Sequence, residues 1–368
     1  MPTVCVTNPS YHLTDHDFYR LLTEAGFTVR FIDPEQHNLN DADTLLAQLD
    51  GCEATICSME PYTAEVLERS NLRVVSRFGV GFDAIDVPAA TQNNIVVTRT
   101  VGVLQESVAE QTLALLFGVS RDVVRRHQAV LEGRWGYTAF PRLAGKTIGL
   151  LGLGSIGRSV ADKANGLGMR VIAYVPSGTP HANVELVSLD QLWAESDVLS
   201  IHAPLKPETE KIVNRETLAK MKRGAILINT GRGGHVDEAA LIEALKSGQL
   251  LGAGLDVFAE EPTPTDNPLL QLDNVVLAPH IAGADDKAFQ DVPVTAAQNV
   301  IDLYQGKWPA GNILNPEASD LSTHKERSMA SKLHDFPTII AKLSKRELAD
   351  CVVCAIDDRY GYDAVTED

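Results

Sequence analysis

The sequence predicts an α/β protein made of two doubly wound parallel sheets, one in each of two domains. Short apolar runs alternate with amphipathic segments through the first hundred residues, and a second such series opens at TIGLLGLG. Strands that alternate with helices pair in parallel, because each helical crossover returns the chain to the same end of the sheet. With 368 residues, 44% of them hydrophobic, the chain is long enough to bury two cores.

The elements follow in order along the chain. The first series has expected strands at TVCVTN, TVRFID, EATIC, RVVSRF and IVVTRT, with helices at DHDFYRLLTEAG and TAEVLERS. One long helix is expected from Val103 to Leu131. The second series has expected strands at TIGLLGLG, VIAYV, DVLSIHA, AILINTG, LLGAGLDVF and VVLAPHIA. The helical pattern at 284–305 has no strand behind it, so we expect it to carry the chain back to the first domain.

The first domain is therefore predicted to be discontinuous. It comprises residues 1–101 and about 288–316, the second domain comprises 102–287, and residues 317–368 form an extension of unknown role. In that extension Cys351 and Cys354 form a CxxC, which indicates a buried strand rather than a metal site, because zinc needs four ligands. Five scattered cysteines predict no disulfide framework, so we expect reduced thiols and no metal.

The composition narrows the possible partners. A formal net charge of −17 and the lack of a basic stripe disfavour nucleic acid and anionic membranes. The N-terminus has no basic region followed by an apolar one, and no run of 18 apolar residues occurs. We therefore expect a cytoplasmic protein whose anionic ligands are held by individually placed cations.

A glycine-rich loop opens the second domain at GLLGLGSIGRS. Gly152, Gly154 and Gly157 form G-x-G-x-x-G between an expected strand and an expected helix. The first glycine permits the tight turn, the second lets a pyrophosphate approach the backbone, and the third allows the helix to pack closely on the strand. The remaining cofactor contacts predicted in this loop are Ser155, Ile156 and Arg158.

The identity of the dinucleotide is left open by the residues after the next strand. An acidic residue that would bind the adenosine ribose is expected there, and VIAYVPSGTP has Val175 instead. No Arg or Lys occurs between 175 and 181 to bind a 2′-phosphate. NAD and NADP both remain open, with NAD slightly favoured. Candidate hydrogen-bonding side chains for either cofactor are Ser177, Thr179, His181 and Lys206.

Three further strands of the second domain end in polar motifs. These motifs are INTGRGGHVDE, GLDVFAEEP and LAPHIAGAD. Ligands of an open parallel sheet bind outside the carboxyl ends of its strands, so we expect Arg232, Glu261 and His280 to converge.

The order of the glycine loop, GRGG, DVFxxEP and PHIAG resembles the D-isomer-specific 2-hydroxyacid dehydrogenase family. RFGVGFDAID and SVAEQTLALL are similar to family motifs too, so the resemblance covers roughly residues 75–300. It implies a flavodoxin-like substrate domain, a Rossmann NAD(P)-binding domain, and hydride transfer between the nicotinamide and a small 2-hydroxy or 2-keto acid. It also implies a homodimer built on the second domain, with the helical segment before the glycine loop at the interface.

The chemistry gives the three motif residues separate catalytic tasks. Oxidising a 2-hydroxy acid removes a proton from oxygen as hydride leaves carbon, so His280 is the candidate acid–base group. Glu261 would hold the imidazole and favour its protonated form. The DVFxxEP pattern selects the glutamate before the proline, which excludes Glu260. Arg232 would anchor the substrate carboxylate and polarise the carbonyl.

The resemblance implies further contacts. Asp256 would bind the nicotinamide carboxamide, and the other expected cofactor contacts are Ala203, Pro204, Thr230, Gly231 and Gly283. In the first domain, the backbone of Val80 and Gly81 would bind the second carboxylate oxygen, a task that suits a glycine-rich turn. Arg77 is a candidate partner for a distal anionic group.

The sequence departs from the family pattern at points that bear on the substrate. The 3-phosphoglycerate branch has an arginine in the strand-end loop that is occupied here by CSMEPYT, with Cys57 and Glu60. We therefore expect a short unphosphorylated acid such as glyoxylate or hydroxypyruvate, with 3-phosphoglycerate dehydrogenase as an alternative. Gln111 replaces a usual histidine, and Lys206 replaces a usual threonine.

The same scaffold is compatible with two other functions. A formate dehydrogenase is disfavoured, because that branch has glutamine where this chain has Glu261. A corepressor-like protein that binds NAD(H) and partner proteins stays open, because that branch resembles the same three motif residues.

Overall fold

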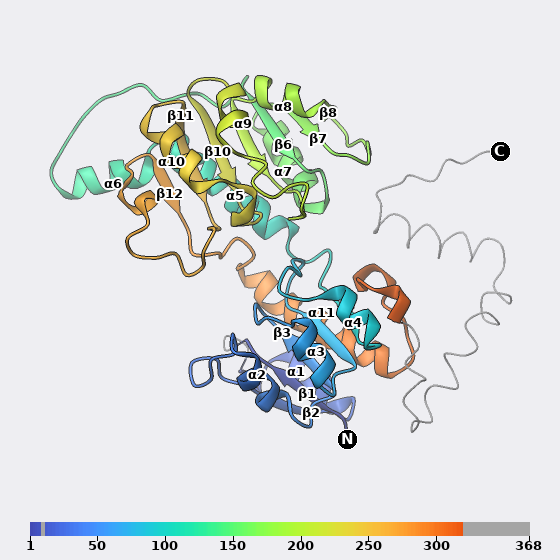
Figure 1. Ribbon diagram of the computed structural model, residues 1–368. Helices are drawn as coiled ribbons and strands as arrows, with labels where there is room; N and C mark the ends of the chain where they lie inside the picture. The colour runs from blue at the N-terminus through green and yellow to red at the C-terminus, as the bar shows by residue number, and fades with distance from the viewer. Residues whose placement is uncertain (9–11, 319–368) are drawn as a thin grey trace, which may run out of the picture. The chain divides into compact units, whose positions relative to one another are not determined.

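The computed structural model describes residues 1–8 and 12–318 (Figure 1). The chain divides into two compact units: Met1–Leu104 with the chain from Asp286 onward, and Gln105–Asp285. The predicted boundaries at 101/102 and 287/288 lie within three residues of these limits. Most of the predicted C-terminal extension, including its CxxC, lies outside the described residues.

The first unit, as far as it is described, contains a five-stranded parallel sheet. Its strand order is β2-β1-β3-β4-β5, which is the flavodoxin-like order. The strands are β1 (Thr3–Val6), β2 (Thr28–Phe31), β3 (Ala54–Cys57), β4 (Val74–Arg77) and β5 (Val96–Thr98). Val4 pairs with Val29 on one side and Ala54 on the other. Because β1, β3, β4 and β5 are almost wholly buried, these strands are continuous apolar runs in the sequence.

The last long helix of the described chain completes the first unit, as the sequence predicts. Val292, Ala296 and Val300 of α11 (Asp286–Tyr304) share an apolar cluster with Val4 and Phe18. The first unit is therefore discontinuous in sequence. Its other helices are α1 (Asp17–Glu24), α2 (Ala42–Leu49), α3 (Ala64–Arg69), α4 (Val87–Gln92), η4 (Ala310–Asn312) and η5 (Pro316–Ala318).

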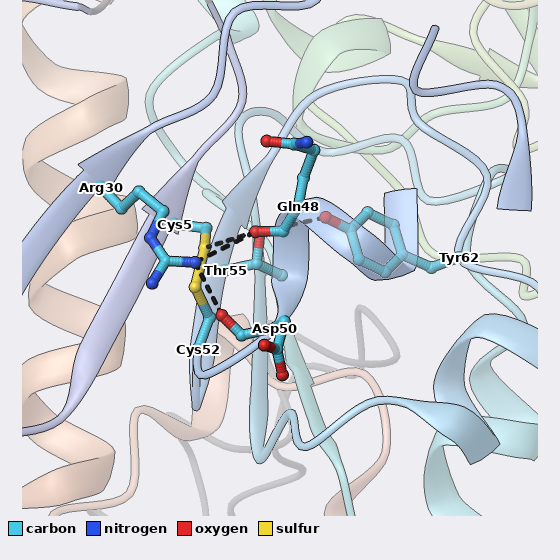
Figure 2. The surroundings of a disulfide bond; sticks show 7 residues. All are labelled: Cys5, Arg30, Gln48, Asp50, Cys52, Thr55 and Tyr62. Atoms are coloured by element: carbon cyan, nitrogen blue, oxygen red, sulfur yellow. Dashed lines mark hydrogen bonds between the residues drawn. A yellow bond between two sulfur atoms is a disulfide. The ribbon is translucent and has the colours of Figure 1, made fainter. Parts of the chain in front are cut away.

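A disulfide joins Cys5 to Cys52 with an S–S distance of 2.17 Å (Figure 2). The expectation of reduced thiols is wrong for this pair. β1 and β3 are neighbours in the sheet, and this pairing brings the two Cα atoms to 6.3 Å although 47 positions separate them in sequence. Beside the bridge, Arg30 donates hydrogen bonds to the carbonyl oxygens of Gln48 and Asp50 at 3.3 and 2.7 Å (Figure 2).

The second unit contains a seven-stranded parallel sheet within the described residues. Its order is β12-β11-β10-β9-β6-β7-β8, which is the Rossmann order with one strand added at an edge. The strands are β6 (Thr147–Leu151), β7 (Arg170–Tyr174), β8 (Glu185–Leu186), β9 (Val198–Ile201), β10 (Ala225–Asn229), β11 (Leu250–Leu255) and β12 (Val275–Leu277). The prediction of two doubly wound parallel sheets is confirmed.

The helical segment predicted from about Val103 to Leu131 consists of two helices, α5 (Gln105–Ser120) and α6 (Val123–Leu131). Asp122 lies between them with a φ of 55°, and its carboxylate accepts hydrogen bonds from two arginines of α6. Such a left-handed residue ends helical geometry. The other helices of the unit are α7 (Ser155–Gly166), α8 (Leu189–Glu195), α9 (Arg215–Lys220), η2 (Gly233–His235), α10 (Glu238–Lys246) and η3 (Pro268–Gln271).

None of the helices within residues 1–8 and 12–318 is long and apolar enough to cross a membrane.

Candidate active site

The glycine loop leads from β6 directly into α7. Gly152 has a φ of 101°, which side chains with a Cβ rarely adopt. A Cβ on Gly157 would lie 2.5 Å from the carbonyl oxygen of Gly152, so the third glycine lets the helix pack against the turn. A Cβ on Gly154 would meet no atom within 4 Å. The middle of the loop is therefore open to a ligand, as a pyrophosphate requires.

The first turn of α7 has no side-chain cap. Its N-cap residue is Gly154, so the amides of Ser155 and Ile156 donate no hydrogen bond to an N-cap side chain. Arg158, expected to contact the pyrophosphate, donates from Nε to the Leu153 carbonyl at 3.2 Å. Uncapped amides at a helix N-terminus bind anions, so the residues present fit a dinucleotide phosphate.

The end of β7 carries no charged side chain for the adenosine ribose. Val175 is partly buried against the apolar core of the unit. His181 Nε2 lies 2.8 Å from Asp162 Oδ1 of α7, and the hydroxyl oxygens of Ser177 and Thr179 are 3.2 Å apart. These polar side chains, predicted as cofactor contacts, therefore have partners within the protein.

The residues after β9 lie against the glycine turn. A Cβ on Gly152 would stand 2.6 Å from the Ala203 amide nitrogen, so the backbones approach closely. Pro204 follows and is exposed. His202, which the sequence reasoning missed, has Nε2 at 2.8 Å from Ser200 Oγ, and burial lowers the pKa of His202 to about 3. An uncharged imidazole therefore supports the turn at neutral pH.

Arg232 lies in a turn that Asn229, the last residue of β10, holds in place. The Asn229 side chain accepts from the Gly231 amide at 3.0 Å and donates to the Arg232 carbonyl at 2.9 Å. Arg232 Nη1 donates to the Gly231 carbonyl at 2.8 Å. The hydroxyl of Thr230 lies 2.9 Å from that of Thr112 in α5. The turn is thus fixed on both sides of Gly231.

Glu261 and His280 are in direct contact, as the sequence reasoning expects. His280 Nδ1 lies 2.6 Å from Glu261 Oε2, and Glu261 Oε1 accepts from the Phe258 amide at 2.9 Å. Burial raises the pKa of Glu261. The hydrogen bonds from His280 and Phe258 and the charge of Arg232 lower this pKa by a larger amount, so its net shift is downward. The carboxylate is therefore ionised at neutral pH, and Arg232 acts on it electrostatically.

The Asp256 carboxylate holds the segment that follows His280. It is fully buried and accepts hydrogen bonds from the Ile281 amide at 3.0 Å and the Ala282 amide at 2.8 Å. His280, with a φ of 54°, donates its own amide to the Asp256 carbonyl at 2.8 Å. For Asp256 the sequence predicts a nicotinamide contact, with capping of a strand end as the alternative; the structure shows the carboxylate bound to two backbone amides. Gly283, another predicted cofactor contact, follows at once and is partly exposed.

The predicted substrate residues of the first unit lie at the end of β4 and in the loop after it. Val80 and Gly81 are partly exposed there. Arg77 is 7% exposed; it donates from Nη1 to the Phe78 carbonyl, and its Nη2 lies 3.0 Å from Met59 Sδ. The guanidinium is thus directed into its own unit.

A Rossmann sheet, an open glycine loop and a paired histidine and glutamate at the strand ends define a dinucleotide-dependent oxidoreductase. The family model of the D-isomer specific 2-hydroxyacid dehydrogenase NAD binding domain matches residues 113–282. A glyoxylate reductase of Korarchaeum cryptofilum is 42% identical over 285 residues, which are 74% of this chain and 86% of the relative.

Solved structures agree with this assignment. A D-lactate dehydrogenase from Aquifex aeolicus complexed with NAD and lactic acid is 29% identical, with a TM-score of 0.74 over 84% of this chain and 98% of that one. An acyclic imino acid reductase in complex with NADPH and D-Arg is 29% identical, with a TM-score of 0.77 over 85% of this chain and 100% of the other.

The chain belongs to the D-isomer specific 2-hydroxyacid dehydrogenase family. It is an NAD(P)-dependent oxidoreductase that acts on the CH–OH group of a small 2-hydroxy acid, or on the carbonyl of the matching 2-keto acid.

Proposed function

We propose that this dehydrogenase reduces a short, unphosphorylated 2-keto acid such as glyoxylate or hydroxypyruvate, with His280 as proton donor. The 2.6 Å contact between His280 and Glu261 carries the proposal. An imidazole held by an ionised carboxylate keeps a fixed orientation and a proton available for transfer. Nε2 is the ring nitrogen left for the substrate, because Nδ1 is occupied by Glu261.

The reaction assigns one step to each group. The nicotinamide, when bound, supplies the hydride to the carbonyl carbon. His280 gives its proton to the carbonyl oxygen, so the keto acid becomes a hydroxy acid. In the reverse direction neutral His280 takes the hydroxyl proton. Glu261 stays ionised throughout, because its pKa is lowered, and it stabilises the charged imidazole.

Arg232 is proposed to anchor the substrate carboxylate and polarise its carbonyl. A guanidinium presents two parallel donors that match a carboxylate. Its backbone is held by Asn229, so only the side chain must move to meet the substrate. The amides of Val80 and Gly81 are proposed to bind the second carboxylate oxygen.

The environment of Arg77 supports an unphosphorylated substrate. Its guanidinium contacts Met59 and the Phe78 carbonyl and is nearly buried, so it is poorly placed for a distal phosphate. The similarity to the Korarchaeum glyoxylate reductase points to the same class of acid. 3-Phosphoglycerate dehydrogenase is the alternative, and turnover of 3-phosphohydroxypyruvate tests it.

We propose NAD(H) as the preferred cofactor. The chain between 175 and 181 has no Arg or Lys that would bind a 2′-phosphate. The partly buried Val175 gives no carboxylate that would exclude one, so the preference is expected to be modest.

The surface of α6 supports a homodimer as the functional form. The segment from α6 onward exposes an apolar set in an otherwise acidic protein, and large exposed apolar areas indicate an interface. Its members are Val123, Val124, Val130, Leu131 and Trp135. A monomer in light scattering contradicts this proposal. Cytoplasmic location stays a prediction from the composition.

The experiment that tests the function follows the absorbance of NADH and NADPH with a panel of keto acids. The panel contains glyoxylate, hydroxypyruvate, pyruvate and 3-phosphohydroxypyruvate. Arg232→Ala is the test variant, and Arg215→Ala is its matched control, because Arg215 pairs with Glu243 on the surface of the same unit. Turnover that is lost only in Arg232→Ala supports the proposal. Cofactor binding without turnover of any keto acid overturns it and favours the corepressor-like alternative.

A further inference from the structure

We infer that Glu238 is a positioning residue, which holds the loop that presents Glu261 to His280. The inference rests on the proposed roles of Glu261 and His280. Glu238 is the first residue of α10, and the loop, residues 256–267, joins β11 to η3. Glu261 lies near the middle of this loop, and none of the motif reasoning gives Glu238 a task.

The Glu238 carboxylate holds the loop on both sides of Glu261. Oε1 accepts from the Ala259 amide at 2.7 Å, before Glu261 in the chain. Oε2 accepts from Asn267 Nδ2 at 3.2 Å, after Glu261. Because one carboxylate binds both limbs, it fixes their separation and therefore the place of the residue between them.

After Asp256, and apart from the contact of Glu261 with His280, the other hydrogen bonds of the loop are internal to it. The Phe258 amide donates to Glu261 itself at 2.9 Å, and the Asn267 amide donates to the Pro264 carbonyl at 3.0 Å. Internal bonds define the shape of a loop without fixing it to the sheet. Phe258 and Leu269 are buried in the core and fix its two ends. Between those ends, Glu238 attaches the loop to α10 by two hydrogen bonds.

Glu238 is itself rigidly placed. The Asp237 side chain accepts from the Ala240 amide at 3.2 Å and caps α10, and Leu241 and Leu245 bury the helix in the core. The segment GRGGHVDE, which ends at Glu238, also contains Arg232. Arg232 and the loop of Glu261 therefore share one support.

The expected effect of losing this attachment is on proton transfer. The hydrogen bond between Glu261 and His280 is short and charge-assisted, and such bonds weaken steeply with distance. Arg232 is the charged group that acts on Glu261 besides His280, and Glu238 acts on Glu261 only through the backbone of the loop. A displaced loop should therefore weaken the hydrogen bond between Glu261 and His280 and lower the rate of reduction, while the glycine loop still binds the dinucleotide.

The test uses Glu238→Ala and Glu238→Gln in the full chain, with Glu243→Ala as matched control on the same helix. Glu243 is exposed and pairs with Arg215. The glutamine keeps an oxygen that accepts from the Ala259 amide. Its NH2 group, however, is a donor that faces the Asn267 Nδ2 donor, so the effect of Glu238→Gln should be intermediate. We expect a roughly 10- to 100-fold loss of kcat/KM in Glu238→Ala, a basic limb of the pH–rate profile at lower pH, and unchanged NADH affinity. Glu243→Ala should match the wild type.

Two outcomes overturn the inference. In the first, Glu238→Ala keeps the kcat/KM and pH profile of Glu243→Ala. In the second, it loses activity together with NADH affinity while its pH profile stays in place, which indicates general damage. Glu261→Gln in the same series separates the two proposals: if Glu261→Gln alters the pH profile and Glu238→Ala does not, only the inference fails. If Glu261→Gln is also silent, the proposed function fails.

Histidine side-chain NMR gives a readout that does not need turnover. The His280 resonance is assigned from its absence in His280→Gln. At a fixed pH, this resonance should shift in Glu238→Ala and coincide with that of the wild type in Glu243→Ala. An unmoved resonance in Glu238→Ala contradicts the inference even if no keto acid in the panel is turned over.

Discussion

Gly233 lies directly against Phe258: a Cβ added to Gly233 would stand 1.8 Å from the Phe258 carbonyl oxygen. Since the next atoms are also backbone, no side-chain rotation can relieve the clash. The second glycine of GRGG therefore permits the close approach of the loop that carries Glu261.

Gly233→Ala should displace that loop. We expect a loss of stability of about 1–3 kcal/mol from overpacking and a roughly 100-fold fall in kcat/KM from misplaced catalytic groups. Gly166→Ala in α7 is the control, because a Cβ there meets no atom within 4 Å. Urea unfolding and steady-state kinetics measure both effects, and wild-type kinetics in Gly233→Ala would contradict the packing argument.

Glu261→Gln should impair reduction while Glu260→Gln should not. The pKa of Glu261 is lowered from its usual value of 4.5. Its ionised form is therefore present from neutral pH down to below pH 4.5 and is lost only as the pH falls through the lowered pKa. We expect a roughly 100-fold or greater fall in kcat for Glu261→Gln, with the basic limb of the pH–rate profile at lower pH. Profiles that coincide for the two variants would refute the assignment.

His202 should make the protein less stable in acid. Its pKa in the folded chain is about 3, below the ordinary 6.5, so between these values the unfolded chain binds the extra proton. The contribution of His202 to the free energy of unfolding is fully present above about pH 6.5. It is lost as the pH falls toward 3, by up to about 1.4 kcal/mol per pH unit.

His202→Gln should flatten this part of the pH dependence. The measurement compares urea unfolding of wild type and variant at pH 7 and at mildly acid pH. His181→Gln serves as control, because His181 lies at the surface beside Asp162. If the free energy of unfolding depends equally on pH in the wild type and in His202→Gln, His202 is not the group that causes the loss of stability in acid.

Removal of the disulfide should destabilise the first unit. The Cys5–Cys52 bridge closes a loop of 47 positions, and loop-closure entropy predicts a loss of about 4 kcal/mol when it is opened. Cys5→Ser combined with Cys52→Ser should therefore unfold at lower urea concentration than the wild type. Cys57→Ser is the control, since Cys57 is buried and free. An unchanged midpoint would mean that the bridge does not form in solution.

Sequence patterns predicted most of the fold, because strands buried on both faces are apolar runs and the glycine loop has a fixed spacing. Contacts between distant segments could not be read in this way. Cys52 meets Cys5 only because β1 and β3 pair, and the break at Asp122 depends on carboxylate contacts that helical periodicity does not report.

In the candidate site, too, the sequence predicted the motif residues but not the contacts that hold them. Glu261 and His280 were found from motifs, and their contact follows from the common edge of the sheet. The supports could not be specified: the two amides that donate to Asp256 lie in another loop, and Glu238 looks like any acidic residue in a first helical turn.

The place of α11 in the chain bears on how the protein is made. The second unit is inserted between Leu104 and Asp286, and α11 comes after it. During synthesis on the ribosome, the first strands and helices emerge without the helix that covers Val4 and Phe18. The nascent first unit must keep this apolar surface away from other chains until the entire second unit has left the exit tunnel. Only then can α11 pack on the first strands and helices and complete the first unit.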